Sequence, residues 1–204
     1  MTNENFGRDV GKIAKMLSRD MPAVSFTIWD MTPFIPHMHN WRKNIIFVEC
    51  DRAAVHALAG IMDVAFPHYD IYTGIKKPIR MGVSRGEKEA SIVIVAREAR
   101  HRREVEGIHP KLEKCLVDLL YYAKGEILPI SLRDVLDLWD HYLTHDEKIR
   151  FNELYRYSLR RYLGWFVSIF AYELSKKNRL RIDERHYKTG SRNLELVRMV
   201  TQHE

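Results

Sequence analysis

The chain has 204 residues, and its hydrophobic fraction of 46% is enough to build the core of one folded domain. It holds no apolar run of about 18 residues, and its first residues, MTNENFGRDVGK, are polar, so neither a membrane span nor a signal peptide is predicted. The two cysteines, Cys50 and Cys115, lie in apolar runs and are expected to be buried free thiols. These features predict a cytoplasmic protein in a reducing compartment, without contact to a membrane.

The net charge of +6 is concentrated in one stretch of the chain. Residues 1–147 are nearly balanced, with 20 Lys+Arg against 21 Asp+Glu, whereas residues 148–192 hold 12 against 4, a local net charge of +8. Such asymmetry favours a polyanion or an acidic protein as partner. A solvated helical face is the alternative, and the composition leaves both open.

The first half of the chain predicts helices that alternate with strands. Residues 6–19 have apolar side chains at helical spacing, and residues 53–66 form a second, Ala-rich helix for which Asp51 is the expected cap. Residues 44–50 are continuously apolar, as is typical of a central strand that is buried on both faces. The predicted strands are 24–29, 44–50, 70–73 and 91–96, with a loop at 31–40 and a turn at 74–78. This alternation predicts a mixed or parallel sheet with helices packed on it.

From residue 108 onward the pattern is helical. Pro110 is placed where a helix can begin, and the apolar face that follows consists of Leu112, Cys115, Leu116, Leu119 and Leu120. Ser131 and Asp134 predict a capped start for a helix over 132–143. Helices over 152–162 and 165–177 are separated at Gly164, and residues 178–191 are predicted to be a hairpin or disordered before a last short helix at 193–201.

The fold class predicted from these elements is α/β (α+β), a small mixed sheet with packed helices and a helical C-terminal half. The expected organisation is an N-terminal helix (1–20), one domain (21–177) and a basic C-terminal extension (178–204). Within the domain, residues 21–107 form the sheet part and residues 108–177 form the helical part.

The catalytic motifs in the sequence are weak, and we assign no catalytic residue, metal or cofactor. Glu49 and Asp51 have the spacing of paired metal ligands, but Asp51 is better explained as a helix cap. Asp70 and Glu98 resemble, distantly, the acidic ligands of a Mg²⁺-dependent nuclease, and this remains an alternative.

Two histidine pairs have spacings that could serve a metal ion. His141 and His145 have i,i+4 spacing, and His37 and His39 flank Met38 in a loop. The sequence marks no third ligand for either pair, so we interpret them as a helix end and a solvated loop.

Arginine-rich segments are the candidate binding residues. Arg156, Arg160 and Arg161 lie on one predicted helix, and tyrosines are interleaved with them, a combination that binds nucleic acids or protein partners. The other candidates are Arg97, Arg100, Arg102, Arg103, Lys176, Lys177, Arg179 and Arg181. In the alternative interpretation, which we favour for Arg156 and Arg160, the arginine stems cover apolar surface and pair with acidic residues of the preceding helix. Those acidic residues are Asp134, Asp137 and Asp140.

Several motifs resemble the C-terminal domain of AbiEi-like abortive-infection type IV antitoxins. The matching segments are Ile28-Trp29-Asp30, Phe47-Val48-Glu49, the turn Lys77-Pro78, the helix from Pro110 to Asp118, and the Tyr/Arg-rich helix 152–162. The resemblance covers roughly residues 22–165, and its motifs are mainly structural.

The resemblance implies a non-enzymatic antitoxin or regulator whose partner is a nucleotidyltransferase toxin in a phage-defence system. Such antitoxins bind DNA through an N-terminal winged helix. Only about twenty residues precede the first predicted strand here, so any contact with DNA or RNA is expected from the basic C-terminal half. A nucleic-acid-binding module is therefore the second hypothesis, and a divergent nuclease is the third.

Overall fold

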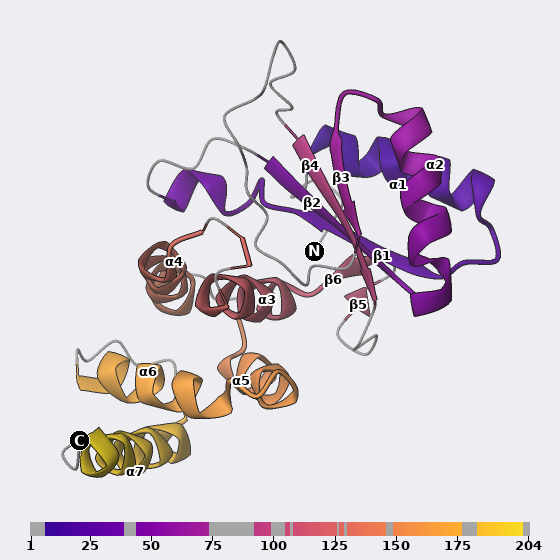
Figure 1. Ribbon diagram of the computed structural model, residues 1–204. Helices are drawn as coiled ribbons and strands as arrows, with labels where there is room; N and C mark the ends of the chain where they lie inside the picture. Colours follow the sequence, from indigo (N-terminus) through magenta and orange to yellow (C-terminus); the bar gives the residue numbers. More distant parts are fainter. Residues whose placement is uncertain are drawn as a thin grey trace.

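A computed structural model describes residues 7–38, 44–73, 92–98, 105–106, 108–125, 127–128, 130–145, 149–176 and 183–201 (Figure 1). Among these residues, no helix is both long and apolar enough to cross a membrane.

A four-stranded mixed sheet forms the N-terminal half. Its order is β1 (Phe26–Asp30), β2 (Asn44–Cys50), β4 (Ile92–Glu98) and β3 (Asp70–Thr73). Strand β1 is antiparallel to β2, whereas β4 is parallel to both of its neighbours. The predicted mixed sheet and the central place of the 44–50 strand are therefore confirmed.

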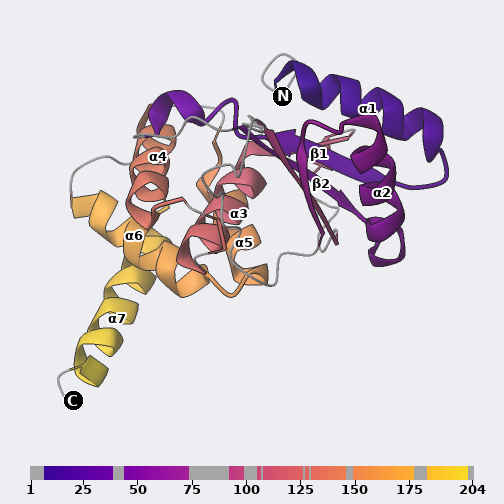
Figure 2. The same ribbon diagram turned by 45° about the horizontal axis from the view of Figure 1, so that its top comes forward.

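Helices cover both faces of this sheet. Helices α1 (Arg8–Asp20) and α2 (Val55–Ala65) lie on one face, and α3 (Leu112–Lys124) lies on the other (Figures 1 and 2). On the α3 side, Trp29 stacks on Phe47 with ring centroids 4.1 Å apart, and Phe47 stacks in turn on Tyr122 of α3. Because β2 is buried from Ile45 to Cys50, both layers share one core.

The chain passes from the sheet to α3 along the free edge of β1. A two-stranded sheet, β5 (Val105–Glu106) with β6 (His109–Pro110), brings it there, and the Ile28 N–H donates to the Ile108 carbonyl at 2.8 Å. Helix α3 begins at Leu112 with Lys111 as its N-cap residue. The prediction that Pro110 opens the helix is therefore wrong, because Pro110 belongs to β6.

Four further helices complete the C-terminal half, namely α4 (Leu132–His145), α5 (Phe151–Arg160), α6 (Gly164–Lys176) and α7 (Glu184–Thr201). The Ser131 hydroxyl accepts the Asp134 N–H at 2.9 Å, so the predicted cap of α4 is confirmed. Helices α4 and α5 pack on α3, α6 packs on α5, and α7 packs on α6 (Figure 2). Helix α3 is consequently the central helix of the molecule, between the sheet and the remaining helices.

Two local predictions were wrong. Asp51 occupies the N-cap position of the short 3₁₀ helix η3 (Arg52–Ala54) that precedes α2, but its side chain makes no capping hydrogen bond. Residues 184–191 are predicted to be a hairpin or disordered, yet α7 is helical from Glu184 onward, while 178–182 lie outside the described residues. Gly190 lets α7 lie close to α6. A Cβ at this position would be 1.9 Å from the Ser168 carbonyl oxygen of α6, so only glycine allows this approach.

Candidate functional site

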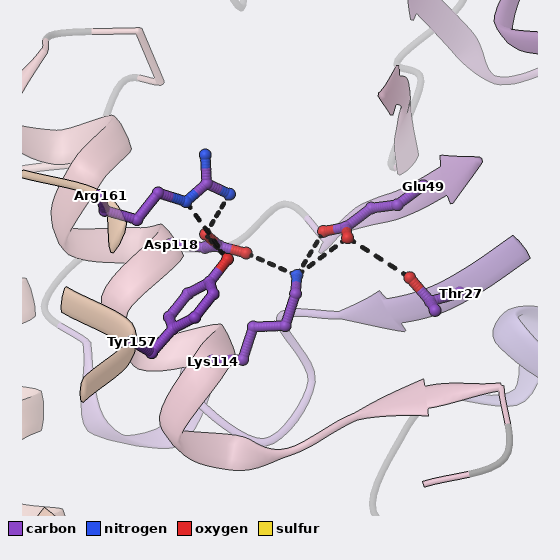
Figure 3. A network of polar contacts seen from close by, with 6 residues as sticks. All are labelled: Thr27, Glu49, Lys114, Asp118, Tyr157 and Arg161. Carbon is purple, nitrogen blue, oxygen red and sulfur yellow. Dashed lines mark hydrogen bonds and ion pairs between the residues drawn. The ribbon is translucent and has the colours of Figure 1, made fainter. Parts of the chain in front are cut away.

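A network of buried polar side chains connects the sheet to the helical half (Figure 3). Its members come from four elements far apart in the sequence. They are Thr27 of β1, Glu49 of β2, Lys114 and Asp118 of α3, Tyr157 of α5, and Arg161 directly after α5.

Lys114 is the centre of this network. Its Nζ lies 2.7 Å and 2.9 Å from the two carboxylate oxygens of Glu49, and 2.9 Å from Oδ2 of Asp118. The Lys114 side chain is only 1% exposed, and both carboxylates are buried as well. Lys114 and Asp118 are four residues apart on α3, so both project from the same side of the helix toward the sheet.

Asp118 extends the network to α5. Its Oδ1 accepts a hydrogen bond from the Tyr157 hydroxyl at 3.1 Å and one from the Arg161 guanidinium at 2.5 Å. The same guanidinium lies over the ring of Tyr121, 5.1 Å from its centroid. Burial alone would lower the pKa of Arg161, but the Asp118 carboxylate raises it overall, so Arg161 stays charged.

The arrangement is suited to holding the fold together and unsuited to a reaction. Two carboxylates face two cations, so the charges balance within a space from which water is excluded. Lys114 is ion-paired on two sides and almost inaccessible, so it presents no open position to a substrate. The contribution of the network is to fix α3 and α5 against the sheet.

The three predicted binding arginines on α5 and directly after it have different environments. Arg161 is 10% exposed and pairs with Asp118, whereas Arg156 is 56% exposed and pairs with Glu153 of its own helix. Arg160 is half-buried. For Arg156, the predicted pairing with the aspartates of α4 is therefore replaced by Glu153.

Of the remaining candidate cations, the structure describes Lys176 and the strand that contains Arg97. Lys176 is exposed, pairs with Glu173 at 3.1 Å and lies over the Tyr172 ring. Arg97 belongs to strand β4. Arg100, Arg102, Arg103, Lys177, Arg179 and Arg181 lie outside the described residues.

An apolar surface lies where α5 meets α6. Among the described residues, the exposed large hydrophobic side chains are Val64 of α2 and three that surround this turn: Leu159, Tyr162 and Trp165. The ammonium of Lys124, at the end of α3, lies 5.3 Å from the centroid of the Trp165 ring. We call these four residues, Leu159, Tyr162, Trp165 and Lys124, the α5–α6 turn surface.

The acidic residues considered for a nuclease do not meet. Asp70 is in register with Val93 of the neighbouring parallel strand, and Glu98 is five residues further along that strand. At about 3.3 Å per residue, their backbones are about 16 Å apart along the strand direction, too far to share a metal ion. The Glu49 carboxylate, in turn, is bound to Lys114.

Three histidines form a row on the surface, although the sequence had marked only pairs. His37 stacks on His141 with ring centroids 4.1 Å apart, and His141 stacks on His145 at 5.1 Å. In the part of the chain that the structure describes, no three His, Cys, Asp or Glu side chains are arranged to hold a metal ion. Burial and the neighbouring His141 lower the pKa of His37. His39 lies outside the described residues.

Comparison with known proteins identifies the family. Residues 3–172 match the model of a family of unknown function, DUF6577. The chain belongs to DUF6577. No curated protein and no solved structure matches the chain.

The DUF6577 match includes the sheet, the buried network and the α5–α6 turn surface, and it ends inside α6. Helix α7 lies beyond the matched residues. The structural centre of the molecule is thus part of the family's common segment, whereas the helix that packs on α6 is outside it.

Sequence reasoning missed the buried network, although a signal was present. Lys114 and Asp118 lie on the mostly apolar helix α3, and they have the i,i+4 spacing of an ion pair. Glu49 interrupts an apolar strand. A buried charge requires a partner of opposite sign, and the simplest partner for Glu49 of the strand is Lys114 of the helix.

Proposed function

We propose that this chain is a non-enzymatic, antitoxin-like binding protein, with a nucleotidyltransferase toxin as its partner. The observation that carries the proposal is the α5–α6 turn surface. It gathers Leu159, Tyr162 and Trp165 on one turn, each about half exposed or more. Exposed apolar groups of this kind mark protein interfaces, and Tyr and Trp are enriched among the residues that dominate binding.

The buried network supports a binding role for a second reason. It fixes α3 and α5 on the sheet, so the turn after α5 is held on a rigid support. A preorganised surface loses less conformational entropy when a partner binds. The resemblance to AbiEi-like antitoxins supplies the class of partner.

A growth assay tests this function. The gene adjacent to the coding sequence, which the proposal expects to encode a nucleotidyltransferase, would be expressed alone and together with this protein, followed by affinity purification of the complex. We expect toxicity of the neighbouring product, relief of toxicity on co-expression, and co-purification of the two proteins. Unrelieved toxicity, or relief without a complex, contradicts the proposal.

Nucleic-acid binding is a second candidate, favoured by the exposed cations of α5 to α7. Arg156, Lys176, Arg185 and Lys188 are all exposed, but each pairs with an acidic neighbour, which reduces the positive potential they offer. Titration of single-stranded and duplex DNA and RNA at several salt concentrations tests this candidate. Phosphate contacts predict a linear fall of log affinity with log salt concentration, and the absence of such binding excludes it.

A further inference from the structure

Tyr162 has a backbone conformation that normally belongs to glycine. The Leu163 N–H donates to the Ser158 carbonyl at 2.8 Å, and the Tyr162 N–H donates to the Leu159 carbonyl at 3.1 Å. These two bonds form a Schellman motif, in which the residue at the position of Tyr162 is left-handed and usually glycine. Tyr162 has φ 59°, and among the described residues it is the one non-glycine residue with positive φ.

Burial does not compensate for this strain. The Tyr162 side chain is 88% exposed, so its ring gains little from the hydrophobic effect. Glycine would close the same turn without the steric cost of a Cβ. Strained residues that folding does not need are concentrated at functional sites, so the tyrosine points to a function of its ring.

The residues around Tyr162 specify the chemistry of a partner. Leu159 is half exposed, and its side chain packs on Gly164, where a Cβ would lie 2.4 Å from its Cδ2. Lys124 lies over the ring of Trp165. Because a cation lies over this ring and Leu159 is aliphatic, the surface fits apolar side chains and a carboxylate better than a row of stacked bases.

We propose that the α5–α6 turn surface is a docking site for a protein, which places an apolar side chain against Tyr162 and Trp165 and a carboxylate against Lys124. The identity of the partner, a nucleotidyltransferase toxin, rests on the function proposed above. Tyr162 is kept in its strained conformation because recognition requires its ring there.

The proposal separates stability from binding at one residue. Tyr162→Gly removes the strain and the ring together, so its melting temperature should rise by about 2 °C. Its affinity for the purified toxin should fall at least tenfold, as expected for an interface aromatic. Trp165→Ala should weaken binding to a similar extent. Val64→Ala, at an exposed apolar residue of α2, is the matched control and should leave the affinity unchanged.

Isothermal titration calorimetry with the purified product of the adjacent gene, alongside thermal melts of each variant, distinguishes the outcomes. If the unaltered protein binds and both turn variants bind equally well, the docking site is overturned and the antitoxin-like function stands. If the unaltered protein does not bind, both are overturned. A Tyr162→Gly variant that melts lower contradicts the strain argument. If single-stranded DNA binds and Tyr162→Gly weakens that binding instead, the protein partner is overturned in favour of a nucleic acid.

Discussion

Arg161 and Tyr162 are neighbours in the sequence and belong to opposite environments. Arg161 is 10% exposed and joins the buried network through Asp118, whereas Tyr162 is 88% exposed on the α5–α6 turn surface. Two residue types, Lys and Tyr, occur in both regions. In the network, Lys114, Arg161 and Tyr157 bind carboxylates of other elements.

The comparison teaches that residue type does not decide between a structural and a binding role. A Tyr/Arg-rich helix predicts binding residues, yet the part of it that faces α3 is committed to the fold. What remains for a partner is the turn where the helix ends. The distinction can be tested by substituting matched pairs of residues, one from the interior and one from the surface, and comparing the stability of the variants.

The lysines of α3 give the largest expected difference. Lys114→Met leaves the carboxylates of Glu49 and Asp118 without their shared cation, so the free energy of unfolding should fall by about 3–5 kcal/mol. Lys124→Met, at the exposed end of the same helix, should change it by at most about 0.5 kcal/mol. Urea denaturation measures both values. Equal losses in the two variants would show that the network is not the structural centre described above.

Arg161, directly after α5, and Arg156 of α5 should differ less. Arg161→Met removes a charged hydrogen bond to Asp118 while Lys114 and Tyr157 still contact that carboxylate, so a loss of about 2–3 kcal/mol is expected. Arg156→Met removes an exposed pair with Glu153 and should cost at most about 0.5 kcal/mol. Urea denaturation again gives the comparison, and a costly Arg156→Met would contradict it.

The hydroxyl groups of Tyr157 and Tyr162 allow the same comparison to be made by removing a single oxygen atom. The Tyr157 hydroxyl donates to Asp118 and accepts from the Arg161 Nε at 3.2 Å. Tyr157→Phe should therefore destabilise the protein by about 1–2 kcal/mol, because both hydrogen bonds involve charged groups. Tyr162→Phe, as the control, should have no measurable effect on thermal stability, since its hydroxyl is at the exposed end of the ring.

The surface histidine row should give the smallest effect. The pKa of His37 is lowered in the folded protein, so the His37 ring binds a proton more readily in the unfolded chain. This group therefore leaves stability unchanged above its unfolded pKa of about 6.5 and reduces it as the pH falls below that value. His37→Gln should flatten the loss of melting temperature between pH 7 and pH 5 by about 1 °C. An unchanged slope would show that the stacked row does not sense pH.

The sequence predicted the mixed sheet and most of the helices because their signals are local. The apolar run at 44–50 indicated the central strand, and Ser131 with Asp134 indicated the start of α4, as observed. The second half of α7 was predicted as a short helix over 193–201, whereas its first half, 184–192, was missed because its sequence is polar and contains Gly190. The reason for that glycine is a contact with Ser168 of another helix, which no local pattern contains.

The candidate site was harder to predict because its geometry depends on packing between distant segments. The arginine stripe was located correctly, but its division into a buried Arg161 and an exposed Arg156 depends on where α3 lies against α5. The strain at Tyr162 is a backbone property that becomes visible only once the Schellman bonds are known. The histidine row similarly requires His37 to meet a helix that is more than a hundred residues later in the chain.

The long sequence separations inside the buried network also have a kinetic consequence. Lys114 meets Glu49 across 65 residues, and Arg161 meets Asp118 across 43, so these pairs form only when the sheet and the helices have come together. Charges that lose their water at that last step contribute little to the folding transition state. Their loss should therefore act mainly on the rate of unfolding. For Lys114→Met we expect a faster unfolding arm in the chevron plot and a nearly unchanged folding arm, which would make the network a determinant of the lifetime of the native state.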